Sequence, residues 1–302
     1  MGSAVSIAAI SMALEGTITG GGPTDSKHRA LLYQTGWQPY SVKIGEHYYS
    51  YSRLEPIAML FGIAADMADI SQVSTEREAD ELGKLVLASV SKNLTSKTWL
   101  SGPSELIKAV SDPDRYGQRY IQRLAGTVVP TGVAQVAQVH DPYLREARTI
   151  LDTIKARVPG LSEGLLPRRD IWGEPIQLEG GLGPDLLSPV YESRLNHDPV
   201  NQTLLKLKVF PSKLSRKIRG VELSGEQYDD FSRVAGRTMK MRLDNIVGTP
   251  GFSSLPEFAQ REVVTRTIST ARETARSLMM MQNPEIIKSA MDAKRATITG
   301  AR

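Results

Sequence analysis

The sequence predicts a mainly α-helical protein, a multi-helix, oligomer-forming body with one small β-hairpin and a Pro/Gly-rich extended arm. Three observations support this fold class. Amphipathic segments with helix-capping residues dominate the chain from residue 74 onward, a short stretch near residue 45 alternates as paired strands do, and one later segment is rich in proline and glycine. We expect helix for about 65% of the residues and strand for fewer than about 10%.

Composition narrows the classes of function. The 302-residue chain is 40% hydrophobic, carries a formal net charge of +4 and contains no cysteine, which excludes disulfides, thiolate metal sites and cysteine nucleophiles. Its four histidines are scattered, and none are spaced as a helical zinc site requires. We therefore expect no metal and no cofactor.

Sequence patterning divides the chain into four regions. Residues 1–22 are an apolar N-terminal segment, expected to be a short helix that is buried or faces another subunit, or else lies against a membrane. Residues 23–160 are expected to hold the hairpin and a helical domain. Residues 161–197 form the Pro/Gly-rich arm, and residues 198–302 form a C-terminal helical domain.

The hairpin is predicted over Ser41–Tyr51, with Gly45 at the first position of a two-residue type II′ turn. Because an isolated hairpin is marginally stable in water, its aromatic side chains must pack on the following apolar helix or on a neighbouring subunit. The scarcity of interleaved Lys and Arg disfavours nucleic-acid stacking. We therefore interpret four aromatic residues here as assembly contacts: Trp37, Tyr48, Tyr49 and Tyr51.

The arm contains four prolines that preclude a helix, at positions 167, 175, 184 and 189. A connection this long is usually functional or wraps another element. We expect it to lie across a neighbouring subunit with Trp172 as the anchor.

Helix-capping signals predict where several helices begin. Asp112 and Asp141, each followed by proline, are expected to cap helices. The last third of the chain is expected to form helices over Pro199–Val209, Gly225–Val247, Pro256–Gln282 and Pro284–Thr297. The third of these is expected to bury a seam formed by Phe258, Val263, Thr267, Ile268, Ala271, Ala275 and Leu278.

Catalytic motifs are not evident in the sequence. It has no phosphate-binding loop, nucleophile elbow, H-E-x-x-H pair or kinase signature, so we assign no catalytic residue and expect a protein that is not an enzyme. Asp66 and Asp69 would need further oxygen donors to bind a cation, and we interpret them as solvated or arginine-paired.

The most distinctive charge feature is a basic cluster between Leu204 and Gly220, which contains no acidic residue. Such a cluster can contact phosphates of a nucleic acid or an anionic lipid surface, or pair with an acidic neighbouring subunit. Its six basic residues are Lys206, Lys208, Lys213, Arg216, Lys217 and Arg219.

Several phrases of the sequence resemble a known family. They include "GWQPYSVKIGEHYYSYSRLEPIAMLFGIAAD", "DPYLREARTILDTIKARVPGLSEGLLPRRDIWGEPI" and "IRGVELSGEQYDDF". These phrases are similar to the C-terminal region of large polyvalent phage and prophage proteins, the internal virion (ejection) proteins, over about Gly20 to Phe231. The resemblance transfers no catalytic residue.

The resemblance implies a structural phage virion protein, packaged in the capsid interior and ejected with the genome to help DNA cross the host cell envelope. After infection it would lie in the periplasm or at the inner membrane. The implied partners are further copies of this chain, portal or other ejection proteins, phage DNA and the host inner membrane. The alternative is a DNA-binding, scaffolding or portal-associated virion protein that uses the basic cluster.

Overall fold

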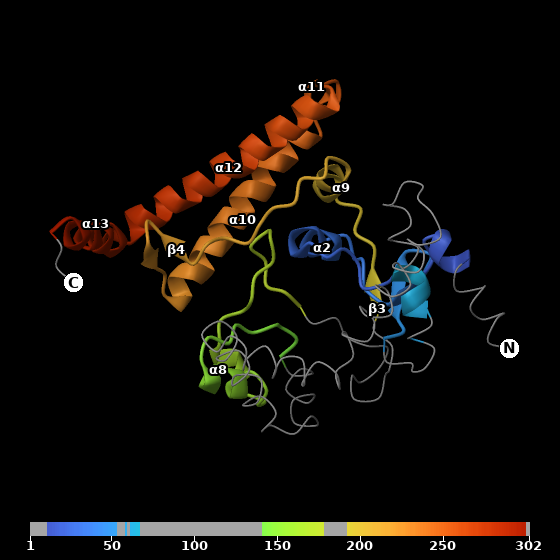
Figure 1. The fold of residues 1–302 in the computed structure, drawn as a ribbon, viewed down its shortest axis with the longest axis horizontal. Coiled ribbons are helices and arrows are strands. Elements are labelled where there is room, and N and C mark those ends of the chain that lie inside the picture. The colour runs from blue at the N-terminus through green and yellow to red at the C-terminus, as the bar shows by residue number, and fades with distance from the viewer. Residues whose placement is uncertain (1–10, 53–57, 59–60, 67–140, 178–191, 300–302) are drawn as a thin grey trace, which may run out of the picture.

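The computed structural model in Figure 1 describes residues 11–52, 58, 61–66, 141–177 and 192–299. About half of the structure is helical, and it contains a small antiparallel sheet, which confirms the helix-rich fold class. Outside the helices, much of the described chain, around residues 156–177 and 207–224, runs as turns and extended backbone.

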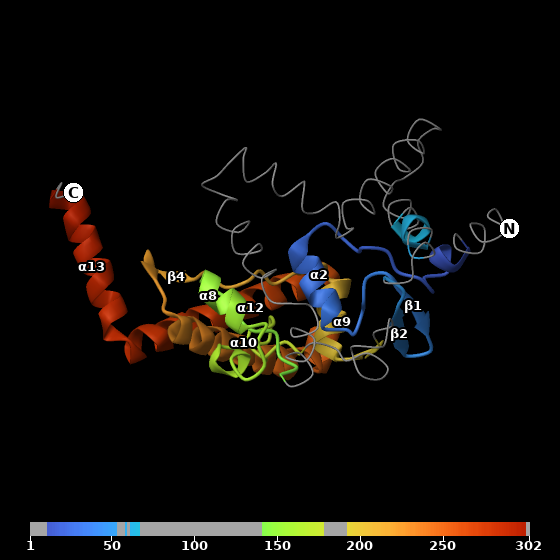
Figure 2. The same cartoon turned by 90° about the horizontal axis from the view of Figure 1, so that it is seen from below.

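Two long helices dominate the C-terminal part (Figure 1). They are α10 (Gly225–Val247) and α12 (Glu257–Gln282), joined through the single turn α11 (Pro250–Ser253) so that they run side by side in opposite directions. Helix α13 (Pro284–Thr299) then leaves the end of α12 at an angle, at the opposite end of the molecule from the small sheet (Figure 2).

Local signals explain where α10 begins. Ser224 and Gln227 form a capping box, in which the Ser224 hydroxyl accepts the Gln227 N–H at 3.1 Å and the Gln227 side chain accepts the Ser224 N–H at 2.9 Å. The predicted helix bounds Gly225–Val247 are confirmed.

The seam of α12 differs in part from the prediction. Ile268, Ala271 and Ala275 are buried as expected, but Phe258 is 74% exposed and Leu278 is 39% exposed. Small alanines at the contact allow α10 to approach closely and thereby determine which face of the helix turns inward. Phe258 lies six residues before buried Val264, about 120° away around a helix of 3.6 residues per turn.

Two short helices pack against the long pair. Helix α2 (Ser26–Tyr33) begins at Asp25, whose carboxylate accepts the Lys27 N–H at 2.9 Å, and α9 (Pro199–Lys206) begins at Asp198, which accepts the Asn201 N–H at 3.0 Å. Both helices contribute to one hydrophobic core with α10 and α12. Its fully buried members include Leu31, Leu204, Leu243 and Val264.

The predicted hairpin is confirmed and gains a third strand. Strands β1 (Ser41–Ile44) and β2 (His47–Ser50) are antiparallel, joined by a turn in which Gly45 has a φ of 62°. Strand β3 (Glu192–Arg194) pairs with the free edge of β2, with Ser193 opposite Tyr48. Strand β3 falls in the predicted arm and was not predicted from the sequence.

Asp141 does not cap a helix, contrary to the prediction. Its carboxylate instead accepts two hydrogen bonds from the Arg145 guanidinium, at 2.7 and 2.8 Å. Helix α8 (Ile150–Lys155) begins later, where Thr149 and Asp152 form a reciprocal capping box. The Asp141 carboxylate therefore binds the Arg145 guanidinium instead of capping a helix, although Asp-Pro is a common helix start. The other predicted cap, Asp112, lies outside the described residues.

A turn at residues 170–174 presses its backbone onto α10. Gly236 faces this turn, and a Cβ atom there would lie 2.1 Å from the carbonyl carbon of Trp172. Gly173 has a φ of 79°, and a Cβ atom there would lie 2.7 Å from the Ser232 carbonyl oxygen. The two glycines therefore permit an approach that no side chain would allow.

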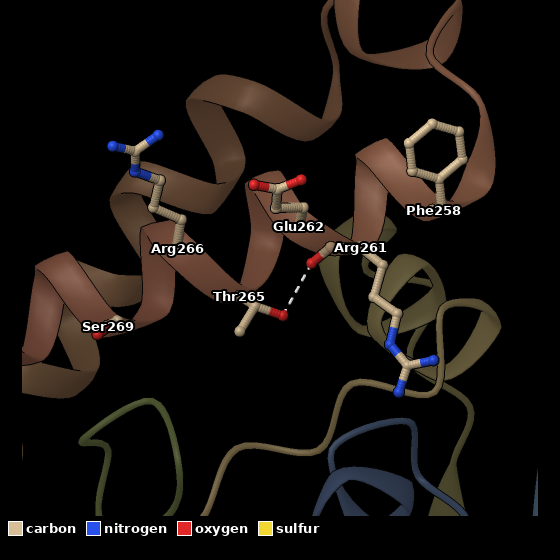
Figure 3. A pocket seen from close by; sticks show the side chains of 6 residues that line it. All are labelled: Phe258, Arg261, Glu262, Thr265, Arg266 and Ser269. Atoms are coloured by element: carbon tan, nitrogen blue, oxygen red, sulfur yellow. Dashed lines mark hydrogen bonds between the residues drawn. The ribbon is translucent and has the colours of Figure 1, made fainter.

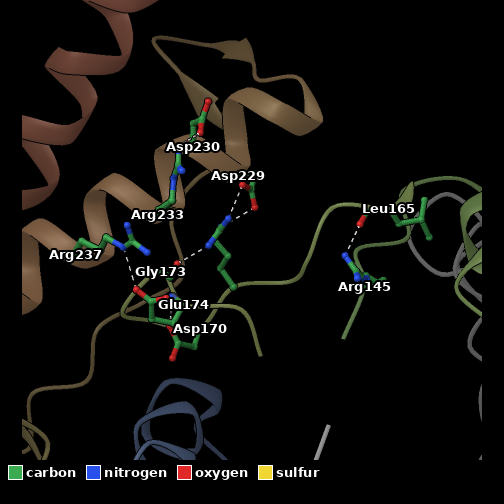
Figure 4. A network of polar contacts seen from close by, with 10 residues as sticks. Arg145, Leu165, Asp170, Gly173, Glu174, Asp229, Asp230, Arg233 and Arg237 are labelled. Atoms are coloured by element: carbon green, nitrogen blue, oxygen red, sulfur yellow. Dashed lines mark hydrogen bonds and ion pairs between the residues drawn. The ribbon is translucent and has the colours of Figure 1, made fainter. Parts of the chain in front are cut away.

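Polar contacts fasten the same turn (Figure 4). Arg169 donates two hydrogen bonds to the Asp229 carboxylate, at 2.6 and 2.7 Å, and a third to the Gly173 carbonyl at 2.8 Å. The Asp170 carboxylate accepts backbone N–H groups of Trp172 and Glu174, each at 2.9 Å. Burial raises the pKa of Asp170, although these two N–H groups oppose the shift.

Candidate functional site

The candidate site is the basic segment, which we define as residues 206–219. It begins at the end of α9, continues as extended chain and ends in a two-stranded hairpin formed by β4 (Lys217–Ile218) and β5 (Val221–Glu222). In Figures 1 and 2 the chain between α9 and β4 runs beside the α10–α12 pair. A hydrogen bond from the Tyr228 hydroxyl to the Leu214 carbonyl, at 3.3 Å, holds it there.

Apolar side chains of the basic segment turn inward. Leu207 and Ile218 are each 1% exposed, and the Phe210 ring stacks on His28 with ring centroids 4.2 Å apart. The cationic side chains turn outward, and all six predicted contact residues are exposed. The fold thus sorts the segment into an apolar inner side and a cationic outer side.

Arg216 differs from the other cations because it is already engaged. Its guanidinium pairs with Glu146 and lies over the Tyr228 ring, 5.0 Å from the centroid. The Glu146 carboxylate also lies 3.4 Å from the Arg148 guanidinium. We therefore assign Arg216 mainly to holding the segment against residues 146–148.

The positive charge of Lys217 is partly balanced as well, because Lys217 lies opposite Glu222 in the register of β4 and β5. Among the residues that the structure describes, no carboxylate lies within 4.0 Å of the other four cationic groups. These four are Lys206, Lys208, Lys213 and Arg219.

Arg168 joins the basic segment from a distant part of the chain. Partial burial, together with the positive charges of Arg168 and Arg216, lowers the pKa of Lys213, whereas Glu146 opposes the shift. Arg168 is exposed. Arg168 was not predicted as a contact residue because it lies in the predicted arm, and only the fold brings it beside Lys213.

A half-buried arginine supports the segment from beneath. Arg272 of α12 donates to the Ser212 hydroxyl at 3.1 Å and to the Ser212 carbonyl oxygen. Burial lowers the pKa of Arg272, and the neighbouring Arg276 adds to this effect. The contact fixes the middle of the basic segment to α12 and adds positive charge below it.

The aromatic residues predicted as assembly contacts are mostly internal. Tyr48 is 7% exposed and Tyr51 is 3% exposed, with the Tyr51 hydroxyl donating to the Thr19 carbonyl at 2.7 Å. Trp37 and Tyr49 are half-buried, and Tyr49 donates to Glu192 at 3.4 Å.

The role of Trp172 also changes. Its indole is 6% exposed in the core of this chain, and its N–H donates to the Asn201 side-chain oxygen at 3.1 Å. It therefore anchors the turn at 170–174 onto its own chain and leaves little surface for a neighbouring subunit. Residues 178–191 of the predicted arm lie outside the described residues.

Other candidate sites offer less. Asp66 was expected to be solvated or paired with an arginine, but it is fully buried and accepts the Gly21 N–H at 2.8 Å. Asp69 lies outside the described residues. A surface hollow along α12 is lined by residues of that helix alone, among them Phe258 and Arg261 (Figure 3). Within the described part of the chain, no group of three His, Asp or Glu residues is placed to hold a metal ion.

Comparisons with known proteins give no assignment. No protein-family model matches the chain, and searches of curated proteins and of solved structures gave no match. None of the helices in the described residues combines the length and the apolar character needed to cross a membrane.

Proposed function

We propose that this chain is a structural, non-enzymatic phage virion protein that is packaged with the genome and leaves the particle with it. The family phrases in the sequence support this proposal. The structural observation that carries it is the basic segment, a row of outward cations on an extended backbone. A linear polyanion such as packaged DNA is the partner that such a row fits.

The geometry favours contact with phosphates over contact with lipid tails. None of the large apolar side chains that are exposed among the described residues lies between Leu204 and Glu222. A peripheral membrane site normally combines basic residues with apolar side chains that insert into the bilayer. The host inner membrane therefore remains a proposed partner only through other parts of the chain.

Self-association is part of the proposal. Met241 on α10 and Phe258 and Met281 on α12 are 57%, 74% and 75% exposed, respectively. Large exposed apolar side chains on packed helices offer area to another subunit or to a portal or ejection protein. Parts of the predicted arm pack within this chain, through Trp172 and strand β3, and its residues 178–191 lie outside the described residues.

A second candidate function rests on the same basic segment. A DNA-binding, scaffolding or portal-associated virion protein would also need outward cations, but it would stay with the particle. The two candidates therefore differ in where the protein is found after genome release, in the envelope of the infected cell or in the emptied particle.

Mass spectrometry of purified particles before and after genome release separates these functions. We expect this protein in full particles, its depletion from emptied ones, and its appearance in the envelope fraction of synchronously infected cells. The shell protein of the same particles serves as the control that must remain. Retention in emptied particles would favour the scaffolding function, and absence from full particles would reject both.

A further inference from the structure

Two cations of the basic segment occupy backbone conformations that rarely carry a side chain. Among the described residues, three that are not glycine have a positive φ: Tyr40 at 52°, Lys208 at 52° and Arg219 at 51°. A Cβ atom makes this left-handed region unfavourable, so glycine or asparagine is the usual occupant. Two of the three exceptions belong to the basic segment.

Lys208 occupies the position after a helix where glycine is commonest. The Lys208 N–H donates to the Leu205 carbonyl at 3.1 Å, and the Val209 N–H donates to the Leu204 carbonyl at 3.0 Å. This pair of bonds defines a Schellman motif at the end of α9, with Lys208 as the left-handed residue. The motif would form at lower cost with glycine there.

Arg219 occupies an equally restrictive turn. It forms the two-residue connection between β4 and β5 together with Gly220, whose φ is 84°. Two successive positive φ angles indicate a type I′ turn, for which Asn-Gly is the preferred sequence. Asparagine in place of Arg219 would therefore suit the backbone better.

Packing does not explain the choice of either residue. Both side chains are exposed, and among the described residues neither has a carboxylate or aromatic partner. Tyr40 contrasts with them, because its ring packs edge-on against Tyr51 with centroids 6.5 Å apart. Strain at Tyr40 accompanies an internal contact, whereas within the described part of the chain Lys208 and Arg219 present an outward positive charge and no ring or ion-pair contact.

We propose that Lys208 and Arg219 contact DNA phosphates and mark the two ends of the surface that binds the phosphodiester backbone. This inference rests on the proposed contact between the basic segment and DNA. Lys213 lies between these ends in the chain, and its neighbour Arg168 adds further positive charge there. An extended chain with cations at both ends matches a linear polyanion better than a single phosphate group.

Two substitutions separate charge from folding. Arg219→Asn and Lys208→Gly each remove a cation and relieve an unfavourable backbone angle. We expect each variant to unfold at a higher temperature than the wild type, yet to bind a 30-base-pair DNA duplex about three- to tenfold more weakly. The slope of log affinity against log salt should fall by about 1 for each cation removed.

Matched variants control for net charge. Arg261→Gln removes an exposed cation of α12, a helix outside the basic segment, and should leave affinity and salt slope unchanged. Arg219→Lys keeps the charge in the same turn and should retain most of the wild-type affinity. A uniform response to every lost cation would instead indicate a general effect of net charge and overturn the assignment.

Other outcomes would also overturn this assignment. They are wild-type affinity in the stabilised variants, a loss of stability in either variant, or absence of DNA binding by the wild type. Tighter binding to phosphatidylglycerol vesicles than to DNA, at equal phosphate concentration, would replace DNA with a membrane. The virion proposal is judged separately, by the protein content of the particles.

Discussion

The segment at residues 141–177 and the basic segment at 206–219 are both rich in cations, but they hold them differently. Arg145 and Arg169 each donate two hydrogen bonds to an aspartate carboxylate and a third hydrogen bond to a backbone carbonyl. In the basic segment, Lys208 and Arg219 are exposed and have no such partner among the residues that the structure describes. Cations with directional, buried partners stabilise the fold, whereas exposed cations in unfavourable turns remain available to a ligand.

The largest expected change in stability comes from comparing substitutions of two adjacent arginines, one with buried partners and one exposed. Arg169→Gln should lower the free energy of unfolding by about 3–5 kcal/mol, because it leaves the Asp229 carboxylate, whose side chain is 13% exposed, without its bidentate partner. Arg168→Gln changes an exposed cation and should cost no more than about 0.5 kcal/mol. Urea unfolding followed by far-UV circular dichroism measures both, and equal losses would contradict the comparison.

A smaller effect is expected where the turn at 170–174 meets α10. Gly236→Ala should destabilise the protein by about 1–3 kcal/mol, since the added Cβ atom would overlap the Trp172 backbone. Gly248→Ala is the matched control, because a Cβ atom there would meet no atom within 4 Å. If both variants proved equally stable, the close approach of the turn to α10 would be refuted.

The smallest expected effect is a loss of stability at acid pH, caused by protonation of Asp141 in its pair with Arg145. The Arg145 guanidinium is the main cause that lowers the pKa of Asp141 from its usual 3.8. The carboxylate therefore stabilises the fold fully above that value, and this contribution is lost as pH falls through the lower folded-state pKa. Its pH-dependent part amounts to about 1.4 kcal/mol for each unit of difference in pKa.

Comparison of the wild type with Asp141→Asn isolates this contribution. The stability difference between them should be largest near pH 6 and should shrink below about pH 4. Urea unfolding across that range measures it. A stability difference that stayed constant with pH would show that folding does not lower the pKa of Asp141.

Local signals were enough to predict much of this fold. Gly45 between two alternating stretches predicted the hairpin, and proline marked the predicted starts of the helices at Pro199 and Pro284. These features depend on residues close together in sequence. The Asp141 signal failed because a guanidinium four residues away competed for the same carboxylate.

The unpredicted features depend on tertiary contacts. Trp172 was predicted to anchor the arm on a neighbouring subunit, but it packs in the core of its own chain, and its partner could be identified only once α9 and α10 were placed around it. The outward cations of the basic segment were named from sequence, but the engagement of Arg216 and the addition of Arg168 were not. Charge composition predicted a surface, and only the fold could distinguish its free cations from its paired ones.

The third strand has a consequence for the order in which the protein is made. Tyr49 and Glu192 are hydrogen-bonded neighbours in the sheet but lie 143 residues apart in the chain. At a synthesis rate of about 5–20 residues per second, roughly seven to thirty seconds separate the two residues on the ribosome. Until β3 emerges, the outer edge of β2 has its backbone groups open to other strands. The nascent chain therefore carries an unprotected sheet edge for nearly half of its own synthesis.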